Sequence, residues 1–98
     1  MSPARLRFLA AAVAEAEKAA AWYGERSQDA REAFLHELEH AFRLIAEGPE
    51  RWPQYRHRTR RLVLKRFPFS VIYRLVGGDP QIIAIAHDKQ RPGYWRRR

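Results

Sequence analysis

The stretch KRFPFSVIYR, residues 65–74, decides the fold. It sets a proline between two phenylalanines and then continues into β-branched and aromatic residues, which is the composition of a strand. Pro68 has no amide hydrogen to donate to a sheet, so it belongs at a strand start or a sheet edge. The stretch therefore predicts a tight passage between two strands, with Phe67 and Phe69 anchored in the core.

Strand-like runs lie on both sides of this passage. Residues 61–67 alternate polar and apolar side chains, whereas residues 69–76 and 81–87 are rich in β-branched residues. The sequence GGDP at residues 77–80 is a turn, so the last two runs should form a hairpin. Residues 49–58, which contain prolines and aromatics, are predicted to be a loop.

Upstream the apolar residues follow a helical period. Residues 10–26 form an alanine-rich helix, and their expected buried stripe is Val13, Ala16, Ala20 and Tyr23. The expected stripe of the next helix is Phe34, Leu38, Ala41 and Ile45, flanked by Leu35 and Phe42. Only residues 24–28 separate the two helices, and a connection this short predicts an antiparallel helix hairpin.

The ends of the second helix carry recognisable signals. Asp29, with Glu32 three residues later, resembles a capping box at the start of the helix. Gly48 and Pro49 predict its end, with the glycine expected in the left-handed region.

Residues 5–9 alternate polar and apolar side chains, which predicts a short first strand. The expected element order is β-α-α-β-β-β in one α+β domain spanning residues 1–98. In this arrangement the helix hairpin covers one face of a small, largely antiparallel sheet. Residues 88–98 form a basic, aromatic tail, whose last three arginines are expected to be solvated and mobile.

Charge is divided unevenly along the chain, whose net charge is +8. Residues 1–50 carry 6 basic and 9 acidic residues (net −3), whereas residues 51–98 carry 13 basic and 2 acidic residues (net +11). The chain has 16 arginines and 3 lysines. The second half should therefore present a positive surface to an anionic partner such as nucleic acid, an acidic protein segment or a ribosomal surface.

Several classes of protein are excluded or disfavoured by composition. The chain has no cysteine, so it has no disulfide framework, thiolate zinc site or cysteine nucleophile. No apolar run is long enough to span a membrane. The apolar residues 8–14 are few and are followed by charged residues at helical spacing, so we expect no signal peptide and a cytoplasmic protein.

One motif resembles a metalloprotease signature. Residues 36–40 read HELEH and match H-E-x-x-H on a predicted helix. His36 and His40, however, lie opposite the apolar stripe of that helix, where they would face solvent. We therefore expect no metal site and no cofactor.

Taken together, the segments resemble the ParE/RelE toxin superfamily of type II toxin–antitoxin systems, specifically its ParE-like (plasmid stabilisation) branch. The resemblance covers nearly the whole chain and is most specific at residues 65–74. It also rests on the Ala21-Trp22-Tyr23 end of the first helix, Phe34 with Glu37-Leu38 and Ala41, the GP…WP.Y loop at residues 48–55, residues 60–64, and His87, Lys89 and RPGYW at residues 91–95.

The resemblance implies a growth-inhibiting toxin that binds and poisons DNA gyrase and is neutralised by a cognate antitoxin, an acidic protein that folds on binding. An alternative is a RelE-like, ribosome-dependent mRNA endoribonuclease, which would be independent of metal. A third is a basic nucleic-acid-binding domain without toxicity. The fold is common to both toxin branches, and no single sequence feature separates them.

The candidate site residues lie in the basic second half. If the chain is a ribonuclease, the catalytic candidates are Arg61, Lys65, Arg74, His87 and Tyr94. The candidates for binding the target or the antitoxin are Arg61, Lys65, Arg66, Arg74, His87, Lys89, Arg91, Tyr94 and Trp95. The strand arginines, Lys65 and His87 are expected to gather on the sheet face away from the helices or at its rim. Tyr94 and Trp95 either stack on a partner or dock onto the sheet.

Overall fold

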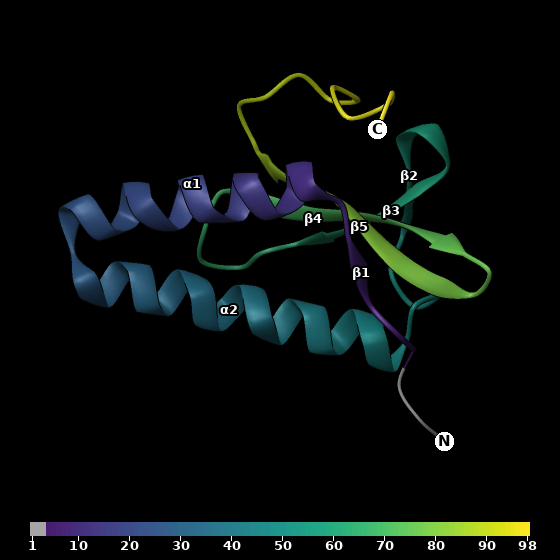
Figure 1. Ribbon diagram of the computed structural model, residues 1–98, viewed down its shortest axis with the longest axis horizontal. Helices are drawn as coiled ribbons and strands as arrows, with labels where there is room; N and C mark the ends of the chain where they lie inside the picture. The colour runs from purple at the N-terminus through teal and green to yellow at the C-terminus, as the bar shows by residue number, and fades with distance from the viewer. Residues whose placement is uncertain (1–3) are drawn as a thin grey trace.

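The computed structural model describes residues 4–98 (Figure 1). Its elements in chain order are β1 (Arg7–Phe8), α1 (Ala10–Arg26), α2 (Gln28–Glu47), β2 (Gln54–Tyr55), a short 3₁₀ helix (Arg56–Arg58), β3 (Thr59–Val63), β4 (Phe69–Val76) and β5 (Asp79–His87). The strands form one sheet in the order β1-β5-β4-β3-β2. β1 is parallel to β5 and every other neighbouring pair is antiparallel. The predicted α+β class and largely antiparallel sheet are confirmed.

Two predictions about strands are wrong. Residues 49–58, predicted to be a loop, contain β2, which pairs with the first two residues of β3. The strand predicted at residues 61–67 ends instead at Val63. It ends there because the amides of Lys65 and Arg66 donate to the Glu37 carboxylate of α2 and not to another strand. Pro68 immediately precedes β4, as predicted.

The helices form the expected antiparallel hairpin, with Ser27 alone between them (Figure 1). The Ser27 hydroxyl accepts a hydrogen bond from the Ala30 amide at 3.2 Å, so Ser27 caps α2. The prediction that Asp29 caps the helix is wrong; Asp29 lies in the first turn, where its charge complements the positive helix end. Gly48 has φ −149° and is not left-handed, contrary to expectation.

The buried face of α1 differs from the predicted stripe. Ala12, Ala19 and Ala20 are its buried residues, whereas Val13 is 41% exposed. Alanine is too small and too frequent in this helix for apolar spacing to identify one face. The buried alanines let α1 lie close to β5, where Ile85 belongs to the same core.

The main core lies between the helices and the sheet. Phe34, Leu38 and Ile45 of α2 are buried against strand residues that include Val71 and Tyr73. The Phe34 ring lies 5.4 Å from the rings of both Phe67 and Phe69, measured between centroids. The residues that flank Pro68 therefore anchor the β3–β4 connection in the core, as predicted.

A second, smaller core lies on the other face of the sheet. β5 contains a bulge: Ile72 is opposite Ala84 and Tyr73 is opposite Ile82, so Ile83 is an extra residue. Ile83 and Ala84 both join this second cluster. The tail covers it with Trp95, which is only 2% exposed. The interpretation that the tail aromatics dock onto the sheet is confirmed for Trp95.

The tail is fastened by the carboxylate of Glu15 on α1. This group accepts hydrogen bonds from the Ile85 amide at 3.0 Å and from the Tyr94 hydroxyl at 2.7 Å. Both terminal nitrogens of Arg98 also donate to it, at 2.8 and 3.0 Å. The carbonyl of the bulged Ile83 accepts a further bond from Arg98. The prediction of a mobile end is therefore wrong for Arg98.

Glu37 fixes the β3–β4 turn in a similar way. Its carboxylate accepts the amides of Lys65 and Arg66 and the Nε–H of Arg66, and its side chain is 12% exposed. Burial alone would raise the pKa of Glu37, but these donors outweigh it and hold the pKa below its usual value of 4.5. Glu37, the first glutamate of the HELEH motif, therefore has a structural role.

We expect Glu15→Gln to lower the free energy of unfolding by about 2 kcal/mol, because it breaks a largely buried ion pair and leaves Arg98 without its partner. Chemical denaturation at neutral pH measures this loss. Glu25→Gln is the matched control: Glu25 is 75% exposed and lies 3.9 Å from Arg26, so its removal should cost less than about 0.5 kcal/mol. Equal losses in the two variants would contradict the importance assigned to Glu15.

We expect Glu37→Gln to make folding less sensitive to acid. Because the pKa of Glu37 is lower in the folded state, its carboxylate contributes fully above the unfolded pKa of 4.5, and the contribution is lost as pH falls through the folded pKa. The variant should be less stable than the native chain by about 2 kcal/mol at neutral pH. The difference should shrink below pH 4.5. Denaturation midpoints measured across this range test the prediction; a constant difference would show that another group is responsible.

Candidate functional site

The predicted site residues do not all converge. Arg61, His87 and Tyr94 line one hollow of about 410 Å³ between the sheet and the tail, together with the buried Ser70. Lys65, Arg66 and Arg74 border other hollows, whereas Lys89 lies beside His87 and lines a neighbouring hollow with it. The prediction that Arg61, Lys65, Arg74 and His87 converge is therefore wrong, because Lys65 and Arg74 line other hollows.

His87 occupies a defined orientation at the end of β5. Its Nδ1 accepts the Lys89 amide at 3.0 Å, and its ring meets Phe69 edge to face at 4.9 Å. In the neutral imidazole the proton then lies on Nε2, because Nδ1 is the acceptor. His87 in this form offers a donor at Nε2, and its one ring lone pair, on Nδ1, is engaged by the Lys89 amide and is not free to act as a base.

Tyr94 and Arg61 are each engaged by a neighbour. Burial, together with the hydrogen bond that its hydroxyl donates to Glu15, holds the pKa of Tyr94 well above its usual value of 10. The phenol therefore stays protonated. The Arg61 guanidinium lies 4.1 Å from the centre of the Tyr55 ring, and Tyr55 in turn stacks on Trp95. Trp95 is buried, so it cannot stack on a partner without leaving the core.

Lys65 and Arg66 lie on the helix side of the sheet edge. They line a groove of about 430 Å³ between α2 and β3, which His36 and His40 also border. β3 ends before these residues, so the alternation that predicted their face does not extend to them.

Arg74 faces the tail, but its guanidinium is partly used. Nε donates to Gln81 at 2.8 Å and Nη1 donates to the Arg98 carbonyl at 3.0 Å. Lys89 borders another hollow, which lies against α1 beside Trp22. Arg91 is exposed in the tail.

The two histidines of the HELEH motif are both exposed, as predicted. Glu37 between them is committed to the β3–β4 turn. Within residues 4–98, no three histidine or acidic side chains are placed to hold a metal ion.

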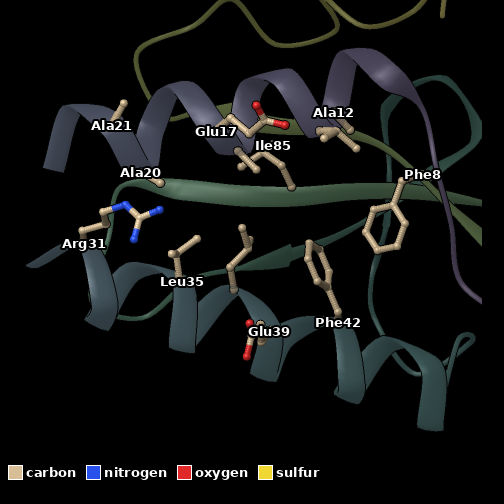
Figure 2. Close-up of a pocket in the computed structure, with 13 residues that line it drawn as sticks. Phe8, Ala12, Glu17, Ala20, Ala21, Arg31, Leu35, Glu39, Phe42 and Ile85 are labelled. Atoms are coloured by element: carbon tan, nitrogen blue, oxygen red, sulfur yellow. The ribbon is translucent and has the colours of Figure 1, made fainter. Parts of the chain in front are cut away.

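A surface that the candidate residues do not include lies between the two helices (Figure 2). This groove has a volume of about 450 Å³. Figure 2 shows Leu35 and Phe42 reaching from α2 toward Ala12 and Ala20 of α1, with Phe8 at one end. Glu17, Arg31 and Glu39 are the charged members of its lining.

The sequence contains a weak indication of this groove. Leu35 and Phe42 flank the core stripe of α2, so that helix carries more apolar residues than one buried face needs. Phe8 and Val13, both more than 40% exposed, extend the same surface onto β1 and α1. Exposed apolar residues that adjoin a groove are typical of a protein-binding surface.

In the part of the chain that the structure describes, neither helix has the length and apolar composition needed to cross a membrane.

Comparison with known proteins agrees with this architecture. Residues 6–92 match the family model described as the ParE toxin of the type II toxin–antitoxin system parDE. The fold is similar to a solved structure described as the chromosomal ParDE system from P. aeruginosa, with a TM-score of 0.74 and 21% sequence identity over 86% of this chain and 95% of that one. No curated protein matches the chain in sequence. The family match covers most of the chain, which therefore belongs to the ParE toxins of type II toxin–antitoxin systems.

Proposed function

We propose that this toxin inhibits growth by binding and poisoning DNA gyrase, without cleaving RNA itself. The observation that favours binding over catalysis is that the candidate acid–base groups in the hollow at the tail are already engaged by neighbouring residues. His87 presents a donor where a base would need a lone pair, and Tyr94 is held by Glu15. Lys65, a further catalytic candidate, lies at a different groove. A binding surface needs charge and shape, and it does not need an acid–base pair.

The RelE-like alternative keeps one observation in its favour. Arg61, His87 and Tyr94 do share a hollow, and an endoribonuclease would need such groups around the scissile phosphate. The third possibility, a basic nucleic-acid-binding domain without toxicity, is supported by the charge of the second half alone.

Purified toxin distinguishes the two toxin mechanisms. With gyrase, ATP and plasmid, we expect broken DNA to accumulate in proportion to toxin; with translating ribosomes, we expect intact mRNA. His87→Ala should change DNA breakage by less than about fivefold, since a binding toxin loses one contact, whereas a ribonuclease that loses its acid–base group slows by about a hundredfold or more. Truncated mRNA from the native toxin, abolished in the variant, would overturn the proposal.

We further propose that the groove between α1 and α2 receives the cognate antitoxin. The similar solved structure is a ParDE toxin–antitoxin system. A segment that folds on binding can place apolar side chains against Leu35 and Phe42 and continue toward the basic half of the toxin. The mixed charges at the rim, Glu17, Arg31 and Glu39, would fix its register.

We expect Val13→Glu to weaken antitoxin binding by at least about tenfold, because it sets a charge in an apolar groove at a position that is already 41% exposed. Val76→Glu is the matched control, since Val76 is 46% exposed and lies in β4 outside the groove lining. Calorimetric titration of each folded variant with the small protein encoded beside the toxin measures the affinities. Equal affinity for both variants would place the antitoxin elsewhere.

A further inference from the structure

A further concavity lies beside the β2–β3 hairpin and shares only Tyr55 with the hollow at the tail. It has a volume of about 300 Å³, and Arg58, Arg60 and Arg74 are among the residues that line it. Among the residues that the structure describes, none with an acidic side chain lines it. Three guanidinium groups around one hollow create a positive potential that attracts an anion.

Each of these arginines keeps N–H donors that no described residue uses. The Arg58 side chain is exposed, and it makes no hydrogen bond to another residue of the described range 4–98. Arg60 uses Nη1 alone, which donates to the carbonyls of Glu50 and Trp52. Arg74 uses Nε and Nη1. These bonds hold Arg60 and Arg74 in place at the hollow while leaving the Nη2 group of each available.

The backbone that presents Arg58 is strained. His57 and Arg58 have φ values of 59° and 61°, the left-handed region that side chains other than those of Gly, Asn and Asp seldom adopt. Two such residues in succession cost about 1 kcal/mol or more each. The conformation is supported from outside: Thr59 donates to the Arg56 carbonyl at 2.6 Å, and the His57 ring lies against Gly93 of the tail. Strain that neighbouring parts maintain is typical of positions that hold a ligand.

The chemistry of the hollow favours phosphate over an acidic peptide. Leu75 and part of Tyr55 are its main apolar contributors, so a bound peptide would bury few side chains there. A phosphodiester needs the charge and the forked donors and little else. Exposed Arg51 and Arg56 lie in the segment that leads into the hairpin and its tip, where they can meet neighbouring phosphates.

We propose that the Arg58–Arg60–Arg74 hollow binds a backbone phosphate of DNA, so that the toxin contacts DNA directly. This inference goes beyond the proposed function, because it requires no gyrase and concerns three arginines that line neither the antitoxin groove nor the tail hollow.

Fluorescence anisotropy of the full chain with a labelled duplex, at several salt concentrations, tests the proposal. Arg58→Asn removes the charge with a residue that tolerates positive φ. Arg43→Gln removes the same charge from an exposed position on α2 and is the matched control. For Arg58→Asn we expect severalfold weaker binding and a salt slope, log Kobs against log[salt], that is less steep by about 0.9, the value of one phosphate contact. For Arg43→Gln we expect the native slope.

Two further measurements distinguish specific phosphate binding from a general effect of charge. Arg58→Lys keeps the charge but loses the forked donors, so it should retain the native salt slope with weaker binding. Inorganic phosphate at matched ionic strength should compete weakly with DNA on the native chain and not on Arg58→Asn.

Equal slopes for Arg58→Asn and Arg43→Gln would show that binding follows overall charge and would overturn the proposal. Polyglutamate at matched charge is a second competitor. If it displaces the duplex as effectively as unlabelled DNA does, the proposal is overturned as well, because the hollow would then be a site for acidic peptide.

Discussion

The Glu15 carboxylate is the contact on which the two-sided architecture depends. β1 pairs with only two residues of β5, so the backbone of β5 beyond Ile82 has no neighbouring strand on that side. Glu15 accepts the amide of Ile85, and Arg98 donates to the carbonyl of Ile83, so these two side chains take the place of the missing strand. Their mutual ion pair then binds the tail to α1. Without this junction the second face of the sheet would stay open.

This closure determines how the positive charge is displayed. Because Trp95 and the rest of the tail cover the middle of the second face, the arginines cannot gather there in one patch. They lie at the rim of the sheet: Arg61 near His87, Arg74 near the hairpin, and Lys65 at the edge beside α2. The net charge of +11 on the second half is thus divided among several separate surfaces.

Periodicity was enough to predict both helices, the β4–β5 hairpin and the proline passage, because large apolar residues dominate those segments. It was not enough for α1, where alanine is on every face and Val13 points outward. The sequence did not predict β2, because the turn that joins it to β3 consists of Arg56, His57 and Arg58 and contains none of the usual turn residues. The site was harder still, because its geometry depends on contacts between residues far apart in the sequence. Glu15 lies 83 residues from Arg98, and no local pattern reports a pair at that separation.

The same separation orders the steps of folding. The helix hairpin and the β4–β5 hairpin join residues that are close in sequence, so their loops close at little entropic cost. The parallel pairing of Arg7 with Gln81 and the bond from Arg98 to Glu15 span most of the chain. Since the tail cannot dock before α1 and β5 are in place, it is the last part to become ordered. During synthesis the second face of the sheet stays uncovered until Arg98 has left the ribosome, and that interval is when its apolar residues are open to misassembly.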